Sequence, residues 1–264
     1  MKMISLTTDF GTRDWFVGTM KGVILGIAPR VVLVDLTHDI PPGDVRGGAF
    51  ALAASCQFLP RGTVHLAVVD PGVGSTRKAI AVRTANYFFV GPDNGVLSLA
   101  LGRERIKSIH QLANDQFFLP AVSRTFHGRD IFAPVAAHLG RGLPIEELGP
   151  AVTDFNRLDW PQSKVRGGVV SGEVVYEDRF GNLITNLDAA SLAGFGDQPC
   201  EVFLARKRLC PVAPFYGAVK VGRPLAVMGS SGFLEISVNG ASAADELGVR
   251  VGDRVCVRRW VKSR

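Results

Sequence analysis

Three short strand-like runs near the N-terminus constrain the fold more than any other feature of the sequence. They cover residues 3–8, 31–36 and 63–69, and the second is continuously apolar rather than alternating. Such a run is typical of a parallel strand that is covered on both faces. Helical periodicity is present between the runs, over 15–27 and over 45–59. The β-α-β-α-β order predicts an α/β domain whose central, mostly parallel sheet is layered with helices.

Aspartates stand where three of the expected helices begin. Asp14, Asp44 and Asp130 directly precede segments with helical character, the last of which covers 131–139. An aspartate in that position accepts hydrogen bonds from free backbone N–H groups. We therefore expect all three to be N-caps.

The sequence pattern changes near residue 155. Residues 156–163 are mostly polar and contain a proline, which indicates a linker. From Lys164 onward, short strand-like runs alternate with glycine, asparagine and aspartate turns, with little amphipathic helix. The prediction is two domains, an α/β domain over 1–156 and an all-β, barrel-like domain over 164–264.

Composition and charge favour a folded cytoplasmic protein without a nucleic-acid partner. The net charge is +6, but the basic residues are spread out and only the C-terminal tail is dense in them. That tail lacks the interleaved aromatic residues of a base-stacking surface. The four cysteines form no CxxC pair, so neither a zinc site nor a disulfide framework is indicated. No run is long enough to span a membrane, and no signal peptide is recognisable.

Polar side chains follow several of the expected strands. Asp9, His38, Asp70 and the pair Asp93–Asn94 each stand at such a position. The carboxyl ends of parallel strands meet at one edge of a sheet, where ligands bind. Asp9 suits a ribose diol, since its two oxygens can accept two hydroxyl hydrogens, and it equally suits a turn. His38, followed by Asp39 and two prolines, is better explained as structural.

The stretch from Asp70 to Arg77 is the strongest candidate for chemistry. A turn rich in proline and glycine separates the two residues, so Arg77 can fold back and keep Asp70 ionised. His127 lies in a polar loop beside Gly128. The alternative is that all three are solvated loop residues. Asp178 and Asn182 can likewise form a simple hairpin, and Ser230 a turn.

Seven segments, in order along the chain, together resemble one family. This is the S-adenosylmethionine hydroxide adenosyltransferase family, which is related to the bacterial fluorinase and chlorinase. The matching segments are Thr7–Gly11, Thr37–Pro41, Val69–Gly74, Gly91–Gly95, Thr125–Asp130, Asp178–Asn186 and Ser230–Gly232.

The resemblance implies an activity and an assembly. Water would attack the ribose 5′ carbon of S-adenosyl-L-methionine, giving adenosine and L-methionine, with no cofactor and no metal. The protein would be a homotrimer, in which residues 164–264 complete the adenine and methionine site of a neighbouring subunit.

The resemblance also assigns roles to individual residues. The catalytic set is Asp70, Arg77 and His127. The substrate-binding residues are Asp9 for the ribose, Asp178 and Ser230 for the methionine part and Asn182 for adenine, together with Asp93 and Asn94, to which no part of the substrate is assigned. Which of Asp70 and His127 takes the proton is left open, as is the preferred sulfonium epimer.

Two alternatives to hydrolysis stand beside it. The first is a module that binds an adenosine compound without turnover. The second is a halogenase that uses S-adenosylmethionine. Halogenases of the resembling group carry a tyrosine in place of Asp70 and a threonine three residues later, whereas this chain has Asp70 and Val73. That difference favours the hydrolase.

Overall fold

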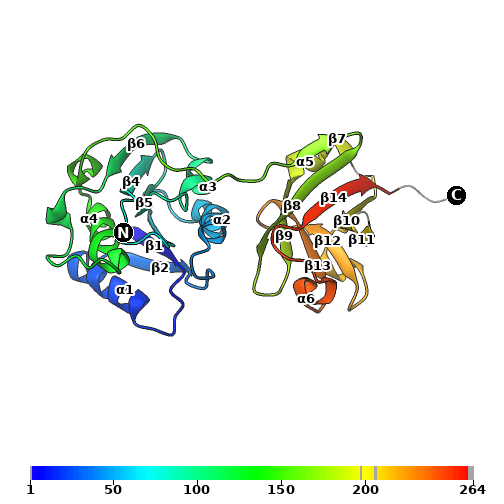
Figure 1. Cartoon of the computed structure of the whole chain (residues 1–264), viewed down its shortest axis with the longest axis horizontal. Coiled ribbons are helices and arrows are strands. Elements are labelled where there is room, and N and C mark those ends of the chain that lie inside the picture. Colours follow the sequence, from blue (N-terminus) through cyan, green and yellow to red (C-terminus); the bar gives the residue numbers. More distant parts are fainter. Residues whose placement is uncertain (1, 197, 205–206, 261–264) are drawn as a thin grey trace. The chain divides into compact units, whose positions relative to one another are not determined.

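The structure is a computed structural model that describes residues 2–196, 198–204 and 207–260. It divides into two compact units, the N-terminal unit over residues 1–158 and the C-terminal unit over 159–264 (Figure 1). Each unit is described by itself.

The N-terminal unit is built on a six-stranded sheet of order β2-β1-β3-β5-β4-β6. Its strands are β1 (Met3–Thr8), β2 (Val32–Thr37), β3 (Val64–Val68), β4 (Ala79–Thr84), β5 (Phe88–Pro92) and β6 (Ile106–Gln111). The first four in spatial order run parallel, and β4 pairs antiparallel with both β5 and β6. The predicted α/β domain is thus confirmed, with a mixed sheet.

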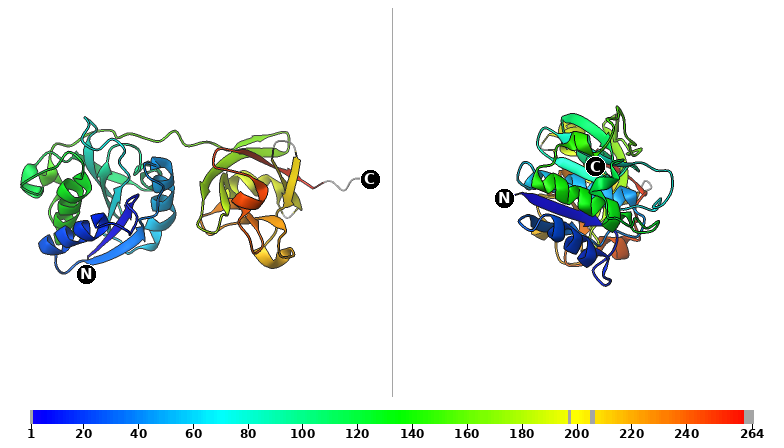
Figure 2. Two further views of the ribbon diagram at one scale, coloured as in Figure 1. Left: turned by 60° about the horizontal axis from the view of Figure 1, so that its bottom comes forward. Right: turned by 90° about the vertical axis from the view of Figure 1, so that its left-hand side faces the viewer.

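Helices cover both faces of this sheet. They are α1 (Phe16–Ile27), α2 (Val45–Ser55), α3 (Ser98–Leu101) and α4 (Ala133–Arg141). Successive residues of β3 point to opposite faces. Leu66 belongs to the core formed with α1 and α4, whereas Ala67 belongs to the core formed with α2 and α3. Figure 2 shows α1 (dark blue) and α4 (green) on one face and α2 on the other.

Three local predictions were wrong. The second strand, β2, is an edge strand with exposed positions, so its continuous apolar run does not reflect burial on both faces. Asp14 does not cap α1, whose N-cap is Trp15. Asp130 lies inside a π-helical turn (Gly128–Phe132) that runs into α4, and its carboxylate accepts a bond from the Ser123 N–H. By contrast, Asp44 caps α2 as predicted.

The C-terminal unit is an antiparallel sheet that curls into a nearly closed barrel. Its strands are β7 (Lys164–Arg166), β8 (Val169–Glu177), β9 (Leu183–Asp188), β10 (Cys200–Leu204), β11 (Lys207–Pro211), β12 (Pro224–Met228), β13 (Phe233–Val238) and β14 (Arg254–Arg259). The path β11-β10-β14-β8-β9-β13-β12 ends near its start, where Val212 bridges to Ala226. Two short helices, α5 (Ala189–Leu192) and α6 (Ala243–Leu247), accompany the strands. The predicted all-β, barrel-like class is confirmed.

Candidate active site

Asp9 and Asp70 come together at the carboxyl edge of the parallel strands. Thr8, the last residue of β1, pairs with Val68, the last residue of β3. Asp9 follows Thr8 directly, and Asp70 follows Val68 after one residue, Val69. The Asp9 carboxylate accepts a 2.8 Å bond from the Gly43 N–H. Burial raises the pKa of Asp9, and the nearby charge of Asp70 adds to the rise. This edge of the sheet therefore concentrates negative charge.

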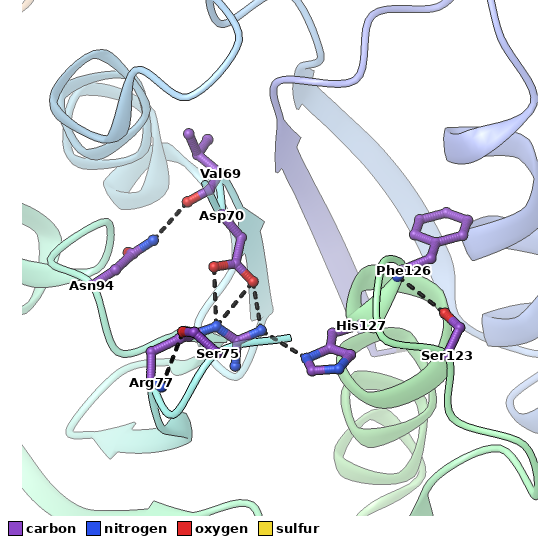
Figure 3. A network of polar contacts seen from close by, with 8 residues as sticks. All are labelled: Val69, Asp70, Ser75, Arg77, Asn94, Ser123, Phe126 and His127. Atoms are coloured by element: carbon purple, nitrogen blue, oxygen red, sulfur yellow. Dashed lines mark hydrogen bonds and ion pairs between the residues drawn. The ribbon is translucent and has the colours of Figure 1, made fainter. Parts of the chain in front are cut away.

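Arg77 folds back over the glycine-rich turn onto Asp70 (Figure 3). Its Nε lies 3.0 Å from both carboxylate oxygens of Asp70, and its Nη2 lies 2.5 Å from Oδ2. The two side chains are only 5% and 11% exposed, and the guanidinium also lies 5.3 Å above the ring of Phe132. A bidentate pair this buried fixes the direction in which the carboxylate points.

His127 completes the cluster from the other side of the guanidinium. Its Nδ1 lies 2.8 Å from Arg77 Nη2, as Figure 3 shows. A guanidinium only donates hydrogen bonds, so Nδ1 accepts here and carries no proton. Burial lowers the pKa of His127, and the positive charge of Arg77 lowers it further. The ring is therefore neutral at neutral pH, with its hydrogen on Nε2.

A close backbone contact holds the two loops of this cluster together. Gly74 has a φ of +76°, and a Cβ at this position would overlap the carbonyl oxygen of Arg124. The loop beyond it is fixed by the bond from the Phe126 N–H to Ser123 Oγ, at 3.0 Å. Buried Asp130 accepts the Ser123 N–H at 2.8 Å. His127 is thus placed by a rigid loop, and only glycine permits the approach at position 74.

Asp93 and Asn94 use their polar atoms within the N-terminal unit. The Asn94 side-chain amide donates to the carbonyl of Val69 at 2.8 Å, directly before Asp70. Asp93 Oδ1 accepts the Asn156 N–H at 2.7 Å. Both residues therefore support the end of the sheet, and their substrate-binding role stays a prediction.

Sequence reasoning assigned Asn156 to the linker and missed this contact. In the structure its side-chain amide also donates to the carbonyl of Asp93, at 2.6 Å. The partners are far apart in sequence, so no local pattern signals the pair. The side-chain contacts of Arg77 with His127 and Phe132 are long-range in the same way.

The candidate residues of the C-terminal unit form their own groups. Asp178 Oδ1 accepts the Asn182 N–H at 2.9 Å, and Oδ2 accepts its side-chain amide at 3.0 Å, so the hairpin alternative is realised. A cavity of about 510 Å³ lies beside this hairpin, lined by Phe180, Asn182, Tyr216 and residues 238–242. Phe180 is 77% exposed. Ser230 is exposed in the turn between β12 and β13.

The described ranges contain neither a cluster of metal ligands nor a membrane-spanning helix. No three His, Cys, Asp or Glu side chains gather there as ligands of a metal ion would. No helix within the same ranges has the length and apolar character needed to cross a membrane. The end of the basic C-terminal tail, residues 261–264, lies outside these ranges.

Comparison with known proteins shows similarity over nearly the whole chain. Residues 4–149 match the model of the SAM hydroxide adenosyltransferase N-terminal domain, and residues 172–256 match that of its C-terminal domain. The chain is 43% identical to the (R)-S-adenosyl-L-methionine hydrolase of Salinispora tropica, over 96% of this chain and 97% of the relative. It is 41% identical to the enzyme of the same name from Thermus thermophilus, over 96% and 98%.

More distant relatives and solved structures agree with this picture. A fluorinase from an Actinoplanes species is 29% identical over 97% of both chains. The crystal structure of an uncharacterized conserved protein from Thermotoga maritima superposes with a TM-score of 0.92 at 38% identity, covering 98% of this chain and all of the other.

Proposed function

The chain belongs to the SAM hydroxide adenosyltransferase family, and on that premise we propose that it hydrolyses S-adenosyl-L-methionine to adenosine and L-methionine. Three relatives that are 40%, 41% and 43% identical to this chain carry the name (R)-S-adenosyl-L-methionine hydrolase. We extend that substrate, including its (R) configuration, to this chain. The observation that carries the proposal is the cluster of Asp70, Arg77 and His127, in which the first two side chains are buried and the third is half-buried.

The main task of the protein in this reaction is to position and polarise the attacking water. The sulfonium of the substrate leaves as a neutral thioether, so its departure needs no acid and the reaction no cofactor. What remains is to hold a water in line with the ribose 5′ carbon, opposite the sulfur, which is a task of proximity and electrostatics. An oriented carboxylate suits this task because it accepts a hydrogen from the attacking water.

The geometry favours Asp70 over His127 as the group that receives the proton. An ionised carboxylate accepts about four hydrogen bonds, and Arg77 makes three contacts, two of them to Oδ2. Oδ1 therefore has room to accept from water. His127 Nδ1 is engaged by Arg77, so its remaining ring nitrogen donates. In this mechanism His127 orients the water through Nε2–H, and Asp70 accepts its hydrogen.

Binding of the substrate draws on both units. In the N-terminal unit, Asp9 accepts the hydroxyl hydrogens of the ribose. In the C-terminal unit, the cavity beside Phe180 and Asn182 presents an exposed ring and an amide, which suit stacking and hydrogen bonding of adenine. Asp178 and Ser230 take the methionine part. A homotrimer that joins the C-terminal unit of one subunit to the N-terminal unit of its neighbour is part of the proposal.

Product analysis tests the activity. The purified chain is incubated with S-adenosyl-L-methionine, and adenosine and methionine are quantified; equal amounts are expected. Asp70→Asn keeps the shape of the side chain but removes its charge, and should lower kcat by about a hundredfold or more. Asp14→Asn, the same change at an exposed aspartate, is the matched control.

Three outcomes would contradict parts of this proposal. Binding of the substrate without release of products would indicate a binding module. Near wild-type turnover in Asp70→Asn would remove Asp70 from the reaction. A fully active monomer, measured by light scattering at the assay concentration, would refute the shared site.

A further inference from the structure

A buried contact beside the proposed active site has no part in the mechanism above. The hydroxyl of Thr8, at the end of β1, lies 2.8 Å from Nδ1 of His38, in the loop after β2. Thr8 is fully buried and His38 is 5% exposed. On the other side of the ring, Nε2 lies 3.0 Å from Asp35 Oδ1, a charge contact without the alignment of a hydrogen bond. Asp35 Oδ2 accepts a 2.6 Å bond from Lys21.

The hydrogen-bonding roles of the two ring nitrogens of His38 can be assigned from these contacts. A carboxylate beside Nε2 favours a proton on that nitrogen, which leaves Nδ1 as an acceptor. Thr8 then donates its hydroxyl hydrogen to Nδ1, while its oxygen accepts the Phe10 N–H at 3.3 Å. Nδ1 of His38 is thereby linked, through one hydroxyl group, to the backbone on either side of Asp9.

Two further hydrogen bonds link the same two loops. The Gly11 N–H donates to the carbonyl of His38 at 2.8 Å. The Gly43 N–H, farther along the His38 loop, donates to the Asp9 carboxylate, also at 2.8 Å. Thr8 and Gly11 are therefore both bonded to His38, the Phe10 N–H is bonded to the Thr8 hydroxyl, and Asp9 lies among these residues.

From this geometry we infer that Thr8 and His38 are positioning residues, which orient the Asp9 carboxylate for the ribose hydroxyl groups of the nucleoside. The inference rests on the proposed function, which assigns the ribose to Asp9. Neither side chain touches the substrate in this arrangement. Their loss should affect only those ligands that carry the hydroxyl pair.

The neighbouring threonine provides a matched control. Thr7 is also fully buried in β1, but no described residue is a hydrogen-bond partner of its hydroxyl. Valine has nearly the size of threonine and an equal preference for strands, so Thr8→Val and Thr7→Val each remove one hydroxyl with little other change. Thr8→Ser retains the hydroxyl and should behave as wild type.

The test compares the affinities of two nucleosides by calorimetry with the full chain. Adenosine carries the 2′ and 3′ hydroxyl groups, and 2′,3′-dideoxyadenosine does not. We expect Thr8→Val to raise the Kd of adenosine about tenfold and to leave the Kd of the dideoxy compound unchanged. Thr7→Val and Thr8→Ser should change neither. If Thr8→Val fails to fold, His38→Leu and His38→Asn give the same comparison, because asparagine retains an acceptor near the Nδ1 position.

The possible failures are distinguishable. Wild-type protein that binds neither nucleoside overturns the proposed function and this inference with it. If wild-type protein binds adenosine more tightly than the dideoxy compound, and Thr8→Val has the same ratio of Kd values, only this inference is overturned. Equal weakening of both nucleosides by Thr8→Val would also overturn it, since that result indicates a general loss of structure.

Discussion

The prediction that depends most closely on the geometry of the site concerns Arg77→Met. The Asp70 carboxylate is 5% exposed, and Arg77 makes three contacts with it. Methionine keeps much of the length and apolar stem of arginine but offers no donor. The variant therefore leaves a carboxylate buried without its cation.

The expected loss of stability follows from the burial of the pair. Removing one partner of a buried ion pair costs about 3–5 kcal/mol, because the other charge stays desolvated. Asp70→Asn should cost less, about 1–2 kcal/mol, since Arg77 keeps its contacts with His127 and Phe132. The double variant should lose less stability than the sum of the two single variants, because it leaves neither a carboxylate nor a guanidinium buried without its partner.

Hydrogen exchange in the full chain measures these differences within the N-terminal unit alone. Amides of β3 and β4 that exchange through opening of the unit should exchange at least about a hundredfold faster in Arg77→Met than in wild type, as a loss of about 3 kcal/mol requires. Two results would refute the reasoning. One is equal acceleration by Arg77→Met and Asp70→Asn, and the other is strict additivity in the double variant.

Three further predictions concern pH, backbone and nucleophile. Burial lowers the pKa of His65 from 6.5 to about 4, so its contribution to stability is complete above pH 6.5 and is lost as the pH falls toward 4, by up to about 3 kcal/mol. Urea titrations should show a shallower pH dependence for His65→Asn. Gly74→Ala should lower kcat about tenfold, because it strains the backbone and pushes against Arg124; unchanged kinetics would contradict the role of that contact. High chloride or fluoride should not yield a 5′-halogenated nucleoside, since a halide about 4 Å from the Asp70 carboxylate meets at most about 4 kcal/mol of repulsion at an effective dielectric of about 20, part of which Arg77 offsets.

The class of each unit was predictable because it depends on patterns that repeat along the chain. Alternation of strands and helices defined the N-terminal unit, and closely spaced turns defined the C-terminal one. The contact between Asp70 and Arg77 was also within reach, since both residues flank one short turn. Local chemistry of this kind is encoded within a few residues.

The wrong predictions concern residues at which a tertiary contact overrides the preference of the local sequence. Asp130 has the features of an N-cap, but the loop at Ser123 engages its carboxylate inside a π-helical turn. The apolar run of β2 suggested a central strand, whereas its position at the edge is set by strand order. The pKa of His127 is lowered by burial and by a guanidinium 50 positions away in sequence. Such contacts are decided by the tertiary fold.

The central claim is that water attacks the ribose 5′ carbon in the site formed around Asp70. Hydrolysis of S-adenosyl-L-methionine in ¹⁸O-labelled water, followed by mass spectrometry of both products, tests it directly. We expect adenosine with one ¹⁸O atom at its 5′ hydroxyl group and unlabelled methionine. Adenosine that forms without the label, or products that form equally fast with Asp70→Asn, would contradict it.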